Sequence, residues 1–332
     1  MQILTGLVYG LPMPMQPLKA MAVLVITQKL SAGVLHGAGL AIGVIMLALS
    51  LSGALGWVTA RIPRSVVRGI QFGLGLSLCS LALKTYLPSE GGVGYILAAA
   101  SFVLVLVLRN SRKWPAALFV IAIGLIYSLS FKVNVSHIAD GIGITLPVWQ
   151  IPGWEQILTG LLVLALPQLP LSLANSVIAT DQTVRDLFPE RKVSVKRIGL
   201  TYALVNIVTS FFGGMPACHG CGGLAGHYAF GARTGGSVVI YGSLYVIIGV
   251  FFSSVSQEVV QVFPKPILAV ILAFEGLTLL MFVRDVASPS RDLFIVLLVA
   301  LCAAFLPHGY LIGLVLGLVL AYADKKSQSE NS

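Results

Sequence analysis

Long apolar runs, separated by short charged or Pro/Gly-rich stretches, recur along the whole chain. Hydrophobic residues make up 57% of its 332 residues and charged residues only 10%, whereas a soluble domain carries about 25% charge. Several runs reach the roughly 17–25 residues that a helix needs to cross the hydrocarbon core. The runs do not alternate between apolar and polar residues, as the strands of a membrane barrel do. The sequence therefore predicts an all-α polytopic membrane protein.

The apolar runs fall into two series. The predicted segments of the first are 1–11, a half-helix at 17–30, 33–58, 66–86, 91–108 and 114–131. The predicted segments of the second are 154–180, 197–212, a half-helix at 217–231, 236–254, 263–282, 292–306 and 308–323. We therefore expect a first repeat over 1–132, a connecting segment over 133–153, a second repeat over 154–323 and a solvated tail over 324–332.

Two Pro/Gly-rich breaks interrupt the series at matching places. Residues 10–19 read GLPMPMQPLK and residues 212–223 read FGGMPACHGCGG, so that Pro14 aligns with Pro216. In lipid, a broken backbone is tolerated only where protein or a water-filled cavity satisfies its polar groups. Four spans follow each break, and the two half-helices run in opposite directions, which predicts an inverted repeat. Paired breaks of this kind point to the substrate site of a transporter.

Basic residues set the expected orientation. The net charge is +9, and most Lys and Arg residues gather at one side of the predicted spans, together with the C-terminus. Only Lys29, Lys84, Lys132 and Lys265 lie at the other side, and Lys19 lies within the membrane. The positive-inside rule places the basic side in the cytoplasm, so the charge reflects topology and we expect no nucleic-acid partner.

The two series are unequal. The first has only residues 1–13 before Pro14, whereas the second has two full spans before its break. We therefore expect the first one to two spans of the first series to be missing, which predicts either a truncated chain or a short variant that works with a partner.

The starts of the half-helices favour an anion. Each helix start has unpaired N–H groups and roughly half a positive charge, and Pro17 suits the first helical position. Glycines such as Gly220 allow the backbone to approach a ligand closely. The predicted substrate-binding residues are Pro14, Gln16, Lys19, Gln168, Asn175, Pro216, Cys218, His219 and Gly220.

Several of these side chains have a second interpretation. Lys19 either counters a bound dianion or extends to the membrane interface. Ser172, Asn175 and Ser176 share one helix face, which either lines the cavity or hydrogen-bonds to neighbouring helices. Cys218, His219 and Cys221 form a C-x-x-C pattern without a second ligand pair, so we expect a lining with His219 as a donor, no metal and no cofactor.

Glu275 is an acidic residue in the middle of an apolar run. Burial favours its neutral form or a paired charge. A titrating group at this depth is a candidate for proton coupling, and a structural pair with a neighbouring helix is the alternative.

Three blocks of sequence resemble the molybdate transporter family, a branch of the SulP sulfate-permease superfamily. They are YGLPMPMQPLKA at 9–20, ALPQLPLSLANS at 165–176, and MPACHG at 215–220 with GGLA at 222–225 and FGAR at 230–233. The resemblance implies a seven-plus-seven inverted-repeat fold with core and gate domains. It also implies an anion held between the two broken helices and elevator-like alternating access. The acidic Gly-Asp-Leu-Gly-Thr-like block typical of the family's first span is absent from this chain.

The sequence thus predicts a secondary active transporter of a tetrahedral oxyanion, with molybdate suggested by the resemblance. Sulfate or another anion carried with protons, and an inactive or partner-dependent subunit, are the alternatives. No Walker motif, nucleophile elbow or zinc helix occurs, so we do not expect an enzyme. The expected location is the inner, cytoplasmic membrane, and the expected partners are the oxyanion, membrane lipid and a second copy in a homodimer.

Overall fold

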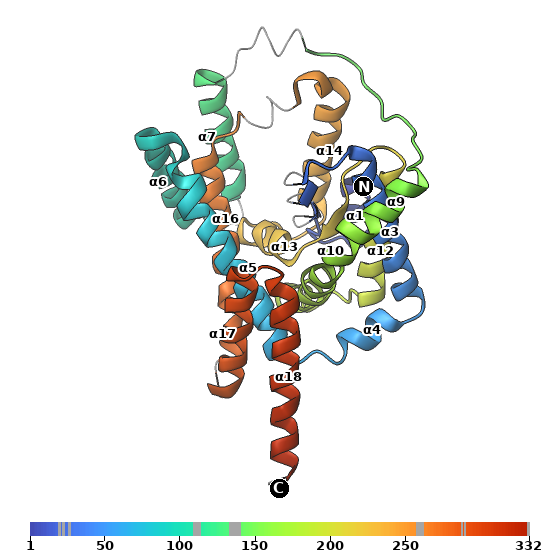
Figure 1. The fold of residues 1–332 in the computed structure, drawn as a ribbon. Helices are drawn as coiled ribbons and strands as arrows, with labels where there is room; N and C mark the ends of the chain where they lie inside the picture. The colour runs from blue at the N-terminus through green and yellow to red at the C-terminus, as the bar shows by residue number, and fades with distance from the viewer. Residues whose placement is uncertain are drawn as a thin grey trace. The chain divides into compact units, whose positions relative to one another are not determined.

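The computed structural model describes residues 1–18, 21, 24–25, 28–108, 114–132, 141–256, 262–286, 288 and 290–330. The α-helices are α1 (Gln2–Tyr9), α3 (Ala32–Leu51), α4 (Ala54–Thr59), α5 (Arg64–Leu81), α6 (Gly91–Leu108), α7 (Ala116–Phe131), α9 (Trp154–Thr159), α10 (Leu166–Leu171), α11 (Thr180–Leu187), α12 (Val195–Ser210), α13 (Cys221–Ala229), α14 (Gly236–Phe251), α16 (Lys265–Met281), α17 (Ser290–Phe305) and α18 (Gly309–Glu330) (Figure 1). The π-helical segments are η1 (Ala82–Tyr86), η3 (Gly160–Ala165) and η4 (Ser172–Ala179), and the 3₁₀ segments are η2 (Leu87–Glu90), η5 (Ser253–Val255) and η6 (Phe282–Asp285). The strands are β1 (Met15–Pro17) and β2 (Ala217–His219).

Helices long and apolar enough to cross a membrane confirm the predicted class. Those that meet both criteria among the described residues are Ala32–Leu51, Arg64–Leu108, Trp154–Leu187 and Lys265–Asp285. Shorter apolar helices, such as Ala116–Phe131 and Gly236–Phe251, accompany them. Their outward faces expose large apolar side chains, as expected of helices in contact with lipid.

The starts of both half-helices differ from the prediction. Pro17 does not occupy a first helical position but ends β1, and residues 217–219 form β2 before α13 begins at Cys221. Of residues 18–30, the described residues Met21, Leu24, Val25 and Gln28 are helical. Because proline lacks an N–H group, it ends regular helix pairing, and here the extended backbone pairs with a second strand.

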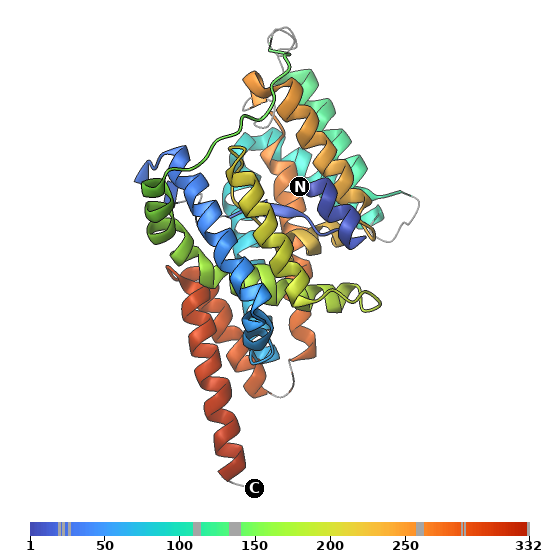
Figure 2. The same ribbon diagram turned by 90° about the vertical axis from the view of Figure 1, so that its right-hand side faces the viewer.

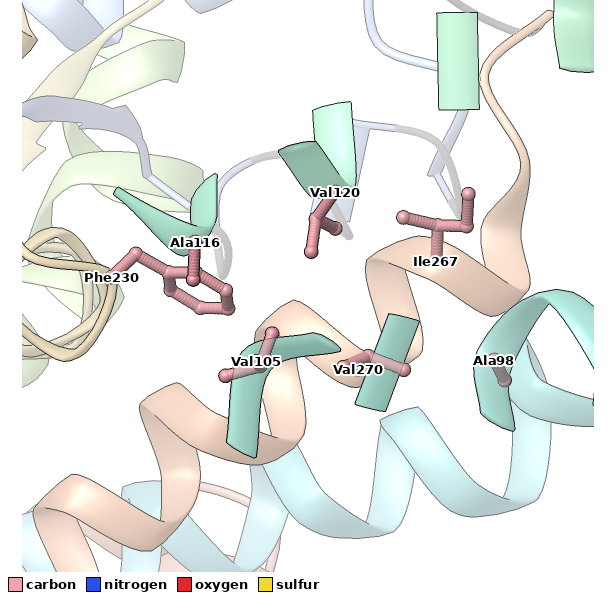
Figure 3. Close-up of a cluster of buried hydrophobic side chains, with 7 residues drawn as sticks. All are labelled: Ala98, Val105, Ala116, Val120, Phe230, Ile267 and Val270. Atoms are coloured by element: carbon pink, nitrogen blue, oxygen red, sulfur yellow. The ribbon is translucent and has the colours of Figure 1, made fainter. Parts of the chain in front are cut away.

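Contacts between Cα atoms divide the chain into two compact units. The first comprises Met1–Met13, Gly75–Leu146 and Ala225–Thr278. Its core packs α6, α7, α16 and the end of α13 around Ala98, Val105, Ala116, Val120, Phe230, Ile267 and Val270 (Figure 3). In the same unit α1 lies against α14, so closely that a Cβ on Gly235 would lie 1.9 Å from the Gly6 carbonyl oxygen.

The second unit comprises Pro14–Leu74, Pro147–Leu224 and Leu279–Ser332. Within it α3 and α12 lie side by side (Figure 2). Gly43 permits this approach, since a Cβ there would lie 3.1 Å from the Ala203 carbonyl oxygen. The pair α17 and α18 packs through glycines four residues apart, at 309, 313 and 317, each facing α17. α18 continues beyond the predicted end at 323 to Glu330.

Candidate functional site

The two breaks meet in a two-stranded antiparallel sheet in the second unit. Met15 pairs with His219, Gln16 with Cys218 and Pro17 with Ala217. The Leu18 N–H donates to the Pro216 carbonyl oxygen at 3.0 Å. The pairing gives the interrupted backbone hydrogen-bond partners inside an apolar protein. It also brings together six of the predicted site residues, namely Pro14, Gln16, Pro216, Cys218, His219 and Gly220.

The Gln16 side chain lies over the first turn of α13. A Cβ on Gly220 would lie 2.8 Å from Gln16 Oε1, and a Cβ on Gly223 would lie 2.2 Å from Gln16 Nε2. The Pro14 ring lies 2.9 Å from the same position on Gly223. A larger residue at either position would therefore displace the Gln16 amide from the helix start.

Asn206 of α12 anchors the second break. Its Oδ1 accepts from the Ala217 N–H at 2.9 Å, and its Nδ2 donates to the Ala217 carbonyl at 2.7 Å and to the Tyr202 carbonyl at 2.8 Å. The side chain is fully buried. Sequence reasoning missed Asn206, although a lone amide within an apolar span was a usable signal, since buried polar groups are hydrogen-bonded.

His219 joins both breaks to α12. Its Nε2 lies 2.8 Å from Thr201 Oγ1, and its Nδ1 lies 3.4 Å from the Pro14 carbonyl oxygen. The residue is fully buried at the end of β2. Both ring nitrogens are thus engaged by protein groups.

Gln168 links α10 to the segment that follows the first break. Its Oε1 accepts from the Met21 N–H at 3.3 Å, and its Nε2 donates to Ser172 Oγ at 3.3 Å. Ser172 Oγ in turn lies 2.8 Å from the Tyr202 hydroxyl. Pro170 lies inside α10, between the π-helical segments η3 and η4, where the missing N–H loosens regular pairing.

Asn175 contacts the first residue of α13. Its Oδ1 accepts from the Cys221 thiol at 3.0 Å. Together with the Ser172 contact to Tyr202, this is the hydrogen bonding between elements that was the alternative to a cavity lining. Within the described ranges, no group of three or more His, Cys, Asp or Glu residues could hold a metal ion.

Two predicted residues remain, Lys19 and Glu275. Lys19 lies outside the described residues. Glu275 belongs to the first unit and is 9% exposed. There its Oε2 lies 3.1 Å from the position of a Cβ on Gly226, so the carboxyl group packs against the backbone of α13.

The groups at the strand pair are mostly neutral donors around a helix start. The first N–H groups of α13 point out of the helix and carry partial positive charge. The Gln16 amide lies over them, and buried His219 lies at the end of the neighbouring strand. Such an arrangement can hold a small anion through N–H groups.

Comparisons with known proteins identify the family. The family described as "Molybdate transporter of MFS superfamily" matches residues 1–78 and 160–279. Molybdate transporter 2 of Arabidopsis thaliana is 32% identical, covering 96% of this chain and 78% of its own length. Molybdate transporter 1 of the same plant is 31% identical, covering 89% and 74%.

A solved structure shares the fold. The transmembrane domain of the cyanobacterial bicarbonate transporter BicA superposes with a TM-score of 0.58 over 94% of this chain and 84% of that domain, at 15% identity. At 15% identity, this similarity is evidence of a shared fold only. With the matches above, it shows that the chain is a membrane anion transporter that belongs to the molybdate transporter family.

Proposed function

We propose that this protein is a secondary active transporter that moves molybdate across the membrane by alternating access. The observation that carries the proposal is the pairing of β1 with β2, because it joins two breaks from distant parts of the chain beside the start of α13. The relatives named molybdate transporters support molybdate among the tetrahedral oxyanions.

The anion would lie at the start of α13, beneath the Gln16 amide. Two helix starts together offer about one unit of positive potential, which suits a dianion. Lys19 is proposed to add a full charge, and Gln16 to donate from its amide. Pro14, Pro216, Gly220 and Cys218 shape the strands beside the anion, while Gln168 and Asn175 hold the flanking helices in place.

The packing of the helices beside the two breaks supports an inverted repeat, and with it alternating access. The helix that precedes the first break, α1, packs on α14, which follows the second break. Conversely α12, which precedes the second break, packs on α3, which follows the first. This reciprocal pairing is expected of two repeats over 1–132 and 154–323 related by a two-fold axis in the membrane plane.

The proposed setting is the inner, cytoplasmic membrane, with the C-terminus in the cytoplasm. The distribution of Lys and Arg along the sequence supports this orientation. A homodimer embedded in lipid is the proposed assembly, and crosslinking of the protein in native membranes would test it.

Uptake into proteoliposomes tests the substrate. Labelled molybdate should accumulate, and unlabelled molybdate should compete better than sulfate. Gln16→Ala and Lys19→Ala should each weaken affinity about tenfold or more, because each removes a donor to a dianion. Gly249→Ala on α14, where a Cβ meets open space, is the matched control.

The outcomes separate the alternatives. Strong sulfate transport without inhibition by molybdate would reject molybdate in favour of sulfate. Binding of neither anion by the purified chain would favour a subunit that depends on a partner, and unchanged affinity in both variants would remove their assigned roles.

Glu275 is proposed to act in proton coupling through α13. Its carboxyl group packs against Gly226, so a change in its protonation could shift that helix. Glu275→Gln should abolish the pH dependence of the maximal uptake rate and leave affinity unchanged. An unaltered rate profile would assign Glu275 a structural role.

A further inference from the structure

The hydrogen-bond partners of His219 can accommodate both the neutral and the protonated ring. Its Nδ1 faces the Pro14 carbonyl oxygen at 3.4 Å and its Nε2 faces Thr201 Oγ1 at 2.8 Å. Thr201 Oγ1 also lies 3.1 Å from two backbone carbonyl oxygens, those of Arg197 and Ile198. The Thr201 hydroxyl therefore has a choice of partners, whereas the Pro14 carbonyl can only accept.

Hydrogen accounting allows two charge states. Because a carbonyl has no hydrogen, Nδ1 donates to Pro14 in both states. In the neutral ring, Nε2 accepts the Thr201 hydroxyl hydrogen. In the charged ring, Nε2 donates to Thr201 Oγ1, and the hydroxyl hydrogen turns to the carbonyl of Arg197 or Ile198. A proton can thus be gained or lost at Nε2 by rotation of one hydroxyl, and every hydrogen bond in the set is kept.

His36 shows the contrast within the same unit. It is also buried, at 8% exposure, but its Nδ1 faces the Gln150 amide nitrogen at 3.1 Å. An amide N–H can only donate, so that ring nitrogen acts as the acceptor of this contact. A hydrogen on His36 Nδ1 is incompatible with that contact, whereas a hydrogen on His219 Nε2 is compatible with both of the ring contacts given above.

The charges close to the His219 ring then determine whether the ring is neutral or protonated. The titratable side chains on the surrounding elements include Tyr202 on α12, Cys218 on β2 and Cys221 on α13, all neutral in their ordinary forms near pH 7. Lys19, which is proposed to lie beside the anion, adds one positive charge, and a bound dianion exceeds this by one negative charge. Burial disfavours a charged ring in the empty protein. A dianion at the adjacent start of α13 would reverse this preference, since an opposite charge nearby favours the charged form.

We propose that His219 takes up a proton when the oxyanion binds, so that one proton and one anion occupy the site together. The inference rests on the proposed function and names a co-substrate of that site. Linkage is reciprocal, so a lower pH must tighten anion binding. Over the pH range in which the empty site is neutral and the occupied site is charged, the dissociation constant should fall about tenfold per unit decrease in pH.

Calorimetry on the purified protein in detergent tests the proposal. Molybdate is titrated in two buffers of different ionisation enthalpy, and the difference gives the protons taken up per anion. We expect about one for the native protein and for His36→Gln, and close to zero for His219→Gln. Thr201→Val should also lower the proton count, because the charged ring loses its acceptor while the histidine itself remains.

The number of protons taken up per anion tests the role of His219 separately from the proposed transport function. Anion binding without proton uptake, or an unchanged count in both His219→Gln and Thr201→Val, overturns the assignment and leaves the transporter proposal intact. Absence of binding by molybdate and by sulfate overturns the proposed function itself. If His219→Gln does not fold, Thr201→Val decides.

Discussion

Replacing Arg68 with methionine tests a buried charge cluster where three segments of the second unit meet. The guanidinium of Arg68, on α5, donates from Nη2 to Asp186 Oδ1 of α11 at 2.9 Å and from Nε to Asp285 Oδ1 of η6 at 3.0 Å. Its Nη1 donates to Gln71 Oε1 at 2.8 Å. Arg68 is 2% exposed, and the side chains of Asp186 and Asp285 are 13% and 31% exposed.

The expected loss of stability follows from the carboxylates that the substitution leaves unpaired. Methionine keeps much of the apolar stem but leaves two largely buried carboxylates without their main cation. Loss of one partner of a buried ion pair costs about 3–5 kcal/mol. Arg64 also contacts both carboxylates and would relieve part of the repulsion, so we expect a value near the lower end of that range. Arg64→Met is the control, because its side chain is 57% exposed and such pairs contribute about 0–1 kcal/mol.

The assay is a denaturant titration of the purified protein in mild detergent, followed by tryptophan fluorescence. Arg68→Met should unfold at markedly lower denaturant concentration than Arg64→Met. Neutralising both acids in the Arg68→Met background, with Asp186→Asn and Asp285→Asn, should recover part of the loss. Equal effects of the two arginine variants would refute the reasoning, as would a triple variant that is less stable than Arg68→Met.

Three further variants test the strand pair. Gly223→Ala places a Cβ 2.2 Å from Gln16 Nε2, so the dissociation constant for molybdate should rise about tenfold or more in calorimetry. Asn206→Asp replaces an amide donor by an acceptor facing two carbonyl oxygens, and should cost about 1–3 kcal/mol in the unfolding titration. The double variant Cys218→Ser with Cys221→Ser should keep uptake within a few fold of the native rate in proteoliposomes, because a hydroxyl can replace the thiol as donor.

Each of these variants has an outcome that would contradict it. Native affinity in Gly223→Ala would show that the Gln16 amide does not meet the anion. Asn206→Asp with native stability would mean that the anchor of the second strand is dispensable. Complete loss of uptake in the folded double-cysteine variant would show that the two thiols do more than donate hydrogen bonds.

The breaks could be predicted because their physics is local. Proline removes a donor and glycine removes a side chain, and within an apolar run either change weakens a membrane-spanning helix at that residue. The membrane-protein class could also be predicted from the sequence, because the length of the apolar runs and the low charge determine it. Pro14 and Pro216 directly precede the two paired strands, at opposite ends of the antiparallel pair, and their membership of one anion site stays a prediction.

The remaining features depend on partners that are distant in sequence. Pro17 reads as a first helical residue until its pairing with Ala217 is known, and a three-residue strand has too short a pattern to detect. Arg68 was counted with the solvent-side charges that mark topology, yet Asp186 and Asp285 bury it. Both carboxylates lie more than a hundred residues away, so spacing along the chain gives no indication of them.

The strand pair is held in place by hydrogen bonds within the protein itself. Asn206 fixes β2, Gln168 reaches the segment after β1, and the two strands pair with each other. None of these bonds uses the first N–H groups of α13, which point out of the helix. In the proposed site the donors would therefore be in position before the anion arrives, and binding would not have to supply the free energy to order them. A site of this kind favours selection by size and hydrogen-bond geometry, which is what distinguishing one tetrahedral dianion from another requires.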